Sequence, residues 1–503
     1  MSFQPVGAAD ARLLEYVRPT AWVNPEPWPR YDLLVLGAGT GGLVSAAIGA
    51  ALGARVALVE RALMGGDCLN YGCVPSKAVL RAARSWAEAR ASAPRFGGPE
   101  AVGTGDFAAA MERMRALRAD LAHVDGAARF RDMGVHVFFG EARFVSPEAV
   151  DVEGTRLRFR RAILATGARA AVPPIPGLAE AGGYTNETIF QLTRLPQRLL
   201  VLGAGPIGCE LAQAFARFGG RVTLVDHADR PLPREEPVAS RVLADALARD
   251  GVELVGGAKV TRVAKSSGRT TVVIERTGAE RSLEGDALLI AVGRSPNVDL
   301  GLEAAGIEYD RRGVTVDARL RTTNRRVYAV GDVASRLQFT HVADAHARIA
   351  VRNALFFGRG KASDLVIPAS TYTSPEVARV GPTAAELAEQ GIAFETIEVP
   401  LDDVDRPRLD GANEGLLLVH VRRGKDSILG ATLVAEHAGD IIAQLTQAMQ
   451  LGVRLGKLGE VVFPYPTTAE VLRKAADRYR RTKLTPRAAK VLASIVRFGR
   501  VLP

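Results

Sequence analysis

Residues 31–60 read YDLLVLGAGTGGLVSAAIGAALGARVALVE, and this stretch decides the fold. An apolar run leads into the glycine cluster that begins at Gly37, an alanine-rich segment follows, and a second apolar run ends at Glu60. Strands that are buried on both faces read as continuous apolar runs, and a glycine cluster after such a run indicates a tight turn. The stretch therefore predicts a strand, a turn, a helix and a second strand parallel to the first.

The same arrangement recurs at residues 199–226, which read LLVLGAGPIGCELAQAFARFGGRVTLVD. In both copies an acid stands 23 positions after the first glycine. The first glycine of such a turn permits the bend, the second lets the backbone approach a pyrophosphate, and the third lets helix and strand pack closely. The pyrophosphate then rests on the N–H groups of the helix N-terminus. The sequence thus predicts two dinucleotide sites, with Gly37, Gly39 and Gly42 in the first and Gly203, Gly205 and Gly208 in the second.

The acid that ends each unit indicates which dinucleotide binds there. Glu60 suits the adenosine ribose of FAD, because a carboxylate accepts hydrogen bonds from ribose hydroxyls. Asp226 suits NADH, because its charge would repel the 2′-phosphate of NADPH. Arg221 and Arg230 lie near Asp226 in the sequence, so NADPH stays an alternative.

Residues 65–77 read GGDCLNYGCVPSK and carry two cysteines, Cys68 and Cys73, at the predicted start of a helix. A regular helix holds the Cα atoms of such a pair too far apart for a disulfide, so a disulfide here must distort the turn, and strained disulfides are the reducible ones. A helix N-terminus and the nearby Lys77 lower the pKa of a thiol. A zinc site needs further ligands, and the third cysteine, Cys209, lies within the second fingerprint. The pair is interpreted as redox-active, with a metal site or inert thiols as the alternatives.

The composition is that of a globular protein with several domains. The chain has 503 residues, 47% of them apolar and 24% charged, which predicts two to four domains. Three cysteines are too few for a secreted disulfide framework. Residues 33–54 carry no charge, but the glycine cluster inside them favours a buried strand and helix over a membrane span or a signal peptide.

The net charge is +10, and ten Lys or Arg with a single acid lie between Arg473 and Arg500. A solvated helical face is the expected structure, and contact with a membrane surface or an acidic partner is the alternative. Nucleic-acid binding is disfavoured, because no recognition motif accompanies the charge.

The cysteine segment resembles the redox-active signature of the pyridine nucleotide–disulfide oxidoreductases, and the resemblance extends over roughly residues 31–475. AILATG (162–167), LLIAVGRSPN (288–297) and VYAVGDVA (327–334) resemble later motifs of the same family. The resemblance implies an α/β fold with two doubly wound Rossmann-like nucleotide-binding domains and a C-terminal α+β dimerisation domain, and hence a homodimer. The predicted domains are an N-terminal extension (1–30), an FAD domain (31–172 and 295–365) split by an NAD(P)H domain (173–294), a dimerisation domain (366–475) and a basic tail (476–503).

The resemblance also implies roles for individual residues. Cys68 would be the interchange thiol that meets the substrate, and Cys73 would be the charge-transfer thiol that lies against the flavin. Lys77 and Glu210 would form an ion pair beside the flavin, with an ordinary surface pair as the alternative. Asp332 would bind the ribityl chain of FAD. The motifs add Gly66, Lys77, Gly167 and Gly331 to the FAD site and Gly293 to the nicotinamide site.

The sequence departs from the disulfide reductases at residues 463–470, FPYPTTAE. Those enzymes carry His-Pro-Thr-x-x-Glu, whose His moves a thiol proton; here Tyr465 stands at the His position and Glu470 keeps the Glu. Tyr has an ordinary pKa of about 10 and is a poor proton shuttle at neutral pH. The mercuric reductase branch carries Tyr there, and its dithiol binds Hg²⁺, a soft metal suited to thiolates. We expect Tyr465 of a partner subunit to complete a site where Cys68 and Cys73 ligate Hg(II) transiently, with a Tyr packed at an interface as the alternative.

The sequence therefore predicts a cytoplasmic FAD-dependent NAD(P)H oxidoreductase that reduces Hg(II) or another thiophilic or electrophilic acceptor. A dihydrolipoamide dehydrogenase-like or other disulfide reductase is one alternative, and a membrane-surface electron-transfer flavoprotein is another. The intact cysteines argue against a flavin-binding protein without catalysis. Two features of mercuric reductases, the vicinal cysteines near the C-terminus and a preceding CxxC domain, are missing.

Three further residues are left without a firm role at the level of sequence. Asp67 replaces the usual Thr beside the expected pyrophosphate, and its charge has no explanation from the motif. His341 and His346 follow the Asp332 motif and could approach the flavin, but packing or a helix surface is the expected role of both.

Overall fold

The computed structural model describes residues 7–103 and 105–500 of the chain. The chain divides into two compact units. The first comprises Met1–Asp229 and Gly251–Leu365, and the second comprises Arg230–Asp250 and Val366–Pro503. Both glycine fingerprints and the two predicted redox cysteines belong to the first unit.

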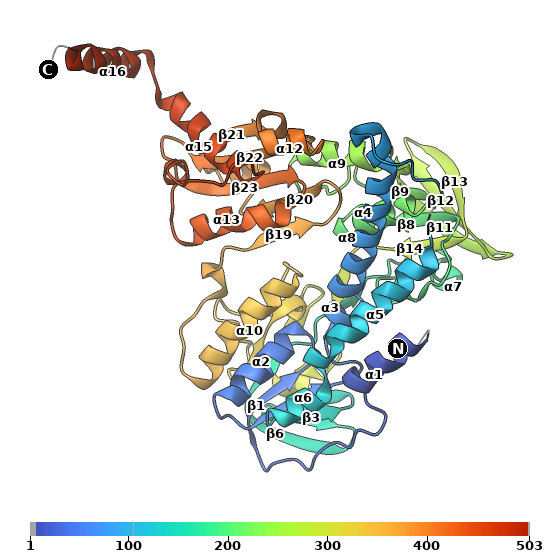
Figure 1. The fold of residues 1–503 in the computed structure, drawn as a ribbon. Helices are drawn as coiled ribbons and strands as arrows, with labels where there is room; N and C mark the ends of the chain where they lie inside the picture. The colour runs from blue at the N-terminus through green and yellow to red at the C-terminus, as the bar shows by residue number, and fades with distance from the viewer. Residues whose placement is uncertain (1–6, 104, 501–503) are drawn as a thin grey trace. The chain divides into compact units, whose positions relative to one another are not determined.

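A seven-stranded sheet forms the centre of the region around the first fingerprint (Figure 1). Its strand order is β3-β2-β1-β6-β5-β4, with β18 also paired to β6. The first βαβ unit is present as predicted, because β1 and β2 are parallel neighbours. Bounds are β1 (Tyr31–Leu36), β2 (Val56–Glu60), β3 (His136–Phe139), β4 (Ala142–Ser146), β5 (Ala149–Val152), β6 (Thr155–Leu164) and β18 (Val327–Ala329).

Helices cover this sheet and carry the cysteine segment. The helix of the fingerprint, α2, packs against α10 (Figure 1), while α4 packs against α5. Bounds are α1 (Ala8–Val17), α2 (Thr40–Ala51), α3 (Gly66–Asn70), α4 (Cys73–Phe96), α5 (Phe107–Asp125), α6 (Ala127–Asp132) and α10 (Thr340–Leu355). Short turns of 3₁₀ helix in this region are η2 (Leu302–Ala305), η3 (Gly331–Val333) and η4 (Ala362–Asp364), and a small hairpin joins β16 (Tyr309–Asp310) to β17 (Gly313–Val314).

A second parallel sheet, of order β10-β9-β8-β14, surrounds the second fingerprint. A three-stranded antiparallel sheet, β11-β12-β13, lies beside it in the sequence, and β7 pairs with β15. The two separate sheets, each built around parallel strands with a βαβ unit, confirm the predicted pair of doubly wound nucleotide-binding folds; in the first sheet β5 pairs antiparallel with β4 and with β6. Bounds are β7 (Ala168–Ala170), α7 (Leu178–Ala181), η1 (Ile189–Gln191), β8 (Arg198–Leu202), α8 (Pro206–Arg217), β9 (Arg221–Val225), β10 (Val252–Val255), β11 (Lys259–Ser266), β12 (Arg269–Arg276), β13 (Ala279–Gly285), β14 (Ala287–Ile290) and β15 (Arg294–Pro296).

The second unit is an α+β fold, as the sequence predicts for the C-terminal part. Its antiparallel sheet has the order β19-β20-β23-β22-β21, and α13 packs against it. Bounds are α9 (Pro237–Arg249), β19 (Pro368–Thr371), β20 (Glu376–Val380), α11 (Ala384–Glu389), β21 (Phe394–Pro400), η5 (Leu401–Asp403), α12 (Asp405–Leu409), β22 (Leu416–Arg422), β23 (Ile428–Ala435), α13 (Ala438–Gln450), α14 (Leu455–Leu458), α15 (Glu470–Lys483) and α16 (Pro486–Gly499).

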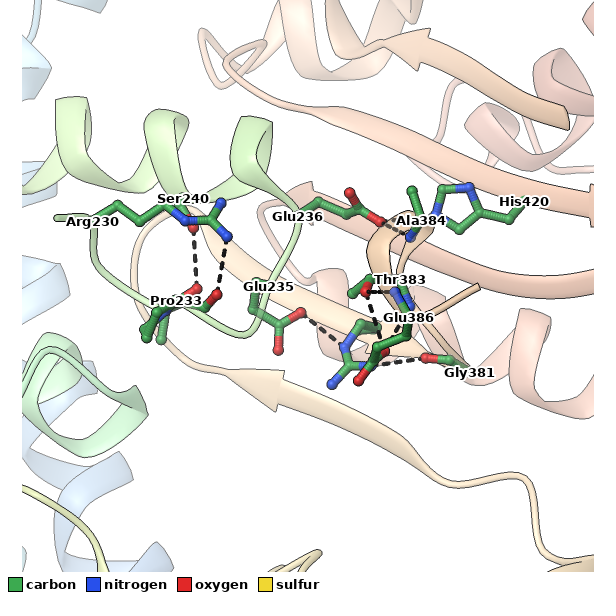
Figure 2. Close-up of polar contacts among 12 residues, drawn as sticks. Arg230, Pro233, Glu235, Glu236, Ser240, Gly381, Thr383, Ala384, Glu386 and His420 are labelled. Carbon is green, nitrogen blue, oxygen red and sulfur yellow. Dashed lines mark hydrogen bonds and ion pairs between the residues drawn. The ribbon is translucent and has the colours of Figure 1, made fainter. Parts of the chain in front are cut away.

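Helix α9 packs with this C-terminal sheet, although its sequence lies inside the stretch predicted as the NAD(P)H domain. Figure 2 shows the polar contacts at its start. Glu236 accepts a hydrogen bond from the Ala384 N–H at 2.7 Å and pairs with His420 Nε2 at 3.0 Å, and the His420 bond lowers the pKa of Glu236. Arg379 Nε donates to Glu235 at 3.0 Å. These buried polar contacts bind α9 to the sheet with every charge partnered.

The N-terminal extension is not an exposed arm in the part that the structure describes. Residues 8–17 form α1, whose Leu13 and Val17 are fully buried. The buried Asp10 of this helix accepts from Arg118 Nη2 at 2.6 Å, and Arg118 Nη1 donates to the Asn70 carbonyl at 2.8 Å. The N-terminal extension therefore packs against the fold along α1, because apolar residues at helical spacing give this helix a face to bury. Residues 1–6 lie outside the described residues.

Replacing Asp10 should destabilise the fold strongly. Asp10→Ala leaves Arg118 buried without its carboxylate partner, and breaking a buried pair in this way costs about 3–5 kcal/mol. Asp120→Ala is the matched control, because Asp120 pairs with Arg12 on the same two helices but both side chains are exposed, and such pairs contribute about 0–1 kcal/mol. Thermal unfolding of both variants measures the difference. Equal melting temperatures would show that the Asp10 pair does not hold α1.

Candidate functional site

The two fingerprints have the same geometry, and it matches the roles expected of the three glycines. A Cβ atom built on Gly42 would lie 1.8 Å from the Gly37 carbonyl oxygen, and one built on Gly208 would lie 1.8 Å from that of Gly203. The third glycine of each turn therefore packs directly on the first. The second glycine faces space: a Cβ on Gly205 would meet nothing within 4 Å.

The second glycine of the first copy lies against the cysteine segment. A Cβ on Gly39 would meet only the Gly66 Cα, at 3.8 Å, whereas one on Gly66 would lie 2.6 Å from the Gly39 Cα. Gly66 also has a φ of 57°, which favours glycine. Two backbones thus meet at the N-terminus of α2, where unpaired N–H groups attract an anion. Both turns fit the pyrophosphate of a dinucleotide.

The two acids that end the βαβ units brace these turns. Glu60 accepts hydrogen bonds from the N–H groups of Ala38 and Ala62, both at 2.7 Å. Asp226 does the same with Ala204 at 2.5 Å and Ala228 at 2.8 Å. Burial raises the pKa of Glu60. Each carboxylate is thereby fixed at the carboxyl end of its strand, where the ribose of a dinucleotide binds in such folds.

The cysteines lie on either side of a break between two helices. Cys68 is inside the short helix α3, Tyr71 and Gly72 interrupt the helical backbone, and Cys73 is the first residue of α4. Both are free cysteines, and so is Cys209, which is fully buried in α8. The break removes the regular helical spacing that would hold the pair apart, as the sequence predicts.

The two thiols contact each other and differ in acidity. The hydrogen bond from Cys68 lowers the pKa of Cys73 to about 6, and the same bond raises the pKa of Cys68. The Thr340 hydroxyl lies 3.2 Å from Cys73 Sγ and also lowers its pKa, as does the charge of Lys77. Their contact therefore favours ionisation of Cys73 over ionisation of Cys68.

Lys77 and Glu210 form an ion pair within the first unit. Lys77 lies one turn after Cys73 on α4, and its Nζ is 2.9 Å from the Glu210 Oε2 on α8. The Glu210 side chain is buried, with 6% of its surface exposed, so the pair is not an ordinary surface pair. It joins α4, which carries Cys73, to α8, the helix of the second fingerprint.

Asp67 takes part in a partly buried charge cluster that the sequence did not predict. Its Oδ1 accepts from Asn186 Nδ2 at 2.8 Å, and its Oδ2 lies 3.4 Å from Arg294 Nη1. Arg294 Nε lies 3.3 Å from the Asp332 Oδ2. Burial raises the pKa values of Asp332 and of the neighbouring Glu187. Arg294 thus compensates two carboxylates that approach the expected FAD site.

The remaining predicted positions have the following places. Gly167 follows β6, Gly331 opens η3 ahead of Asp332, and Gly293 precedes β15. The three have positive φ values of 65°, 69° and 132°.

The two histidines that follow the Asp332 motif differ in burial, and their roles stay predictions. Both lie on α10. His346 is buried there, and burial lowers its pKa. His341 is exposed and stacks on Phe339.

Tyr465 and Glu470 lie in the second unit and do not bond to each other. Tyr465 is 71% exposed, and its hydroxyl donates to the Asp405 Oδ2 at 3.0 Å, which raises its pKa. Glu470 is buried and accepts from Arg473 at 2.7 Å. The Glu that would orient an acid–base residue is therefore engaged elsewhere, and the completion of a partner's site by Tyr465 stays a prediction.

Arg294 and Thr340 are the site residues that the sequence did not reveal. Arg294 lies inside the motif LLIAVGRSPN, directly after Gly293. A charged residue next to a predicted cofactor-binding glycine could have indicated a role in the site. Thr340 gave no such signal, because only the packing of α10 brings it to Cys73.

Comparison with known proteins agrees with this geometry. The pyridine nucleotide-disulphide oxidoreductase family matches residues 31–347, and the dimerisation domain of that family matches residues 367–476. A mercuric reductase from Bacillus cereus is 36% identical over 94% of this chain and 75% of its own. A dihydrolipoyl dehydrogenase from Thermus scotoductus is 34% identical over 89% of this chain and 97% of its own. The Cu(II) complex of RclA, an HOCl-induced flavoprotein disulfide reductase from Escherichia coli, has a TM-score of 0.80 and 30% identity over 90% of this chain and 99% of its own.

The chain belongs to the pyridine nucleotide-disulphide oxidoreductase family. It is an FAD-dependent oxidoreductase that uses a nicotinamide cofactor, and its dimerisation domain indicates a homodimer. The two glycine turns with their bracing acids fit the two dinucleotides. Among residues 7–103 and 105–500, no helix combines the length and apolarity that crossing a membrane requires.

The Thr340 hydroxyl should set the acidity of Cys73. Alkylation of Cys73 by iodoacetamide should rise with pH to half its maximal rate near pH 6, because only the thiolate reacts. Thr340→Val removes a hydrogen bond to a charged group, which contributes about 1.5–3 kcal/mol, so the midpoint should rise by about one unit or more. Ser76→Ala is the control, since Ser76 bonds the Cys73 carbonyl and not its sulfur. An unchanged midpoint in Thr340→Val would remove Thr340 from this role.

The Asp67 charge should weaken FAD binding, and Arg294 should offset it. Asp67→Asn should lower the Kd for FAD about tenfold, because it removes a partly buried negative charge beside the diphosphate. Arg294→Gln should raise the Kd by at least as much, and the double variant should recover part of that loss. Flavin fluorescence during reconstitution of the apoprotein measures all three. A weaker affinity in Asp67→Asn would mean that the carboxylate does not face the diphosphate.

Proposed function

We propose that this enzyme reduces Hg(II), or another thiophilic metal ion, at the Cys68–Cys73 pair with NADH as the electron donor. The contact between the two reduced thiols carries the proposal, because it offers a soft metal one thiolate and one thiol side by side. A mercuric reductase among the relatives and a Cu(II) complex among the similar structures support a metal substrate.

Cys73 and Cys68 would bind the metal in a set order. Cys73 is ionised at neutral pH and supplies the first sulfur ligand. Cys68 becomes the second ligand when its thiol proton leaves to solvent, since metals bind the thiolate form. The raised pKa of Cys68 makes this the step that low pH opposes. The Lys77 charge, close to Cys73, favours the ionised form throughout.

The bound flavin supplies the two-electron chemistry that links the nicotinamide to the metal. The chain's own residues would hold the two dinucleotides. The diphosphate of FAD would rest on the turn of Gly37, Gly39 and Gly42. The diphosphate of the nicotinamide cofactor would rest on the turn of Gly203, Gly205 and Gly208. The Lys77–Glu210 pair fixes α4 against α8, so that the thiols and the second dinucleotide site keep one geometry. The overall reaction is Hg²⁺ + NADH → Hg⁰ + NAD⁺ + H⁺, which balances in atoms and charge.

Asp226 supports NADH over NADPH. Its carboxylate is fixed by two N–H groups where the adenosine ribose binds, and a 2′-phosphate placed there meets a fixed negative charge. Arg221 lies at the opposite end of β9, about 16 Å away at roughly 3.3 Å per residue. That distance leaves Arg221 unable to bind the phosphate.

Tyr465 would act from the partner subunit as a ligand or a wall of the metal site. Its exposure in a single chain supports a contact with the partner subunit.

A dihydrolipoyl dehydrogenase-like activity is the second candidate, because a relative of that name is 34% identical over nearly its whole length. That activity needs an acid–base residue, and the raised pKa of Tyr465 makes it a poorer one.

Substrate-dependent NADH oxidation should identify the acceptor. Hg(II) with excess thiol should be turned over, while lipoamide and glutathione disulfide should not, and NADPH should serve less well than NADH. Cys68→Ser and Cys73→Ser should each lower Hg(II) turnover at least about 100-fold, since each removes a metal ligand. The flavin content of each variant serves as the folding control. Turnover of lipoamide without any metal reduction would refute the proposal and favour the second candidate.

A further inference from the structure

Helix α16 has no packing partner among the described residues. It spans Pro486–Gly499, begins at an N-cap Thr485 that accepts from the Ala488 N–H, and buries none of its residues. The family's dimerisation domain matches only as far as residue 476, so α16 lies beyond the part of the chain that this fold requires. Its structure therefore needs another explanation.

The apolar side chains of α16 gather on one half of the helix. Successive residues turn by about 100°, so positions three and four apart share a face. The large apolar residues fall within one half-turn of the circumference, and each is between 52% and 68% exposed. They are Val491, Leu492, Ile495, Val496 and Phe498. A globular protein rarely leaves such a continuous apolar stripe uncovered.

The other half of α16 is basic. It carries Arg487, Lys490, Arg497 and Arg500, and the sequence has no acid between Asp477 and Arg500. All four basic residues are exposed, and no ion pair to them occurs among the described residues. An apolar half and a wholly basic half together are typical of helices that lie in the surface of an anionic membrane.

We propose that α16 binds an anionic phospholipid bilayer, lying along its surface with the apolar half among the acyl chains. A helix of 14 residues is about 21 Å long, which is too short to cross a hydrocarbon core of about 30 Å. The apolar stripe enters the bilayer, and the basic half meets the headgroup phosphates. The proposal is independent of the acceptor that the cysteines reduce.

Charge favours this occupant over a second copy of the chain. The chain carries a net charge of +10, so anionic lipid attracts the basic half of α16, whereas a second copy offers it no net negative charge. An anionic bilayer also complements both halves at once, whereas an acidic protein surface would leave the apolar half exposed.

Vesicle flotation of the full-length, flavin-loaded protein tests the proposal. Vesicles of phosphatidylcholine with about 30% anionic phosphatidylglycerol should carry the protein, and pure phosphatidylcholine should carry much less. Lys490→Gln with Arg497→Gln should lower the partition coefficient at least about tenfold, because each basic residue near an anionic surface contributes roughly fivefold. Val491→Asp with Ile495→Asp should abolish binding. No α16 residue is buried, so NADH oxidation should not change.

Arg423→Gln with Lys425→Gln is the matched control, since it removes the same charge from an exposed turn outside α16 and should leave binding intact. If the Lys490/Arg497 variant and this control both bind vesicles as strongly as the wild type does, the proposal is refuted. A second outcome would assign the apolar stripe to another copy of the chain instead. In that outcome the wild type does not bind vesicles, and the Val491/Ile495 variant loses self-association in sedimentation.

Discussion

In each fingerprint the carbonyl of the first glycine occupies the space where any side chain on the third would have to lie. This contact fixes the start of α2 against the end of β1, and the start of α8 against the end of β8. The N-terminal N–H groups of both helices consequently point at one edge of each sheet, where a diphosphate can rest on them. Two nucleotide sites with a common geometry follow from one backbone constraint.

The cysteine chemistry depends on that first constraint. Gly66 can approach Gly39 closely because neither has a side chain, and the approach carries the following segment over the N-terminus of α2. The interruption at Tyr71 and Gly72 then separates α3 from α4 and lets the two thiols touch. An asymmetric pair results, in which hydrogen bonds from Cys68 and from the Thr340 hydroxyl of α10 lower the pKa of Cys73.

Charge is distributed differently in the two parts of the molecule. Around the site it is paired and partly buried: Arg294 lies between Asp67 and Asp332, and Lys77 pairs with Glu210. In α16 it is exposed and of one sign. The paired charges at the site stabilise its geometry, because removing one partner leaves the other charge uncompensated. The exposed charges of α16 can attract an oppositely charged partner.

The sequence by itself determined the features that depend on local backbone chemistry. The paired glycine turns, their terminal acids, the parallel strands around them and the cysteine pair at a helix start could all be predicted from residue type and spacing. So could the α+β character of the C-terminal part, because strand and helix periodicities differ.

Only the tertiary structure decided which distant residues meet. Thr340 is 267 positions from Cys73, and Arg294 reaches Asp67 across a similar gap, so no spacing rule connects them. The burial of α1 and the packing of α9 on the C-terminal sheet escaped prediction for the same reason. Periodicity shows that a helix has a face to bury, whereas long-range packing selects the surface that covers it.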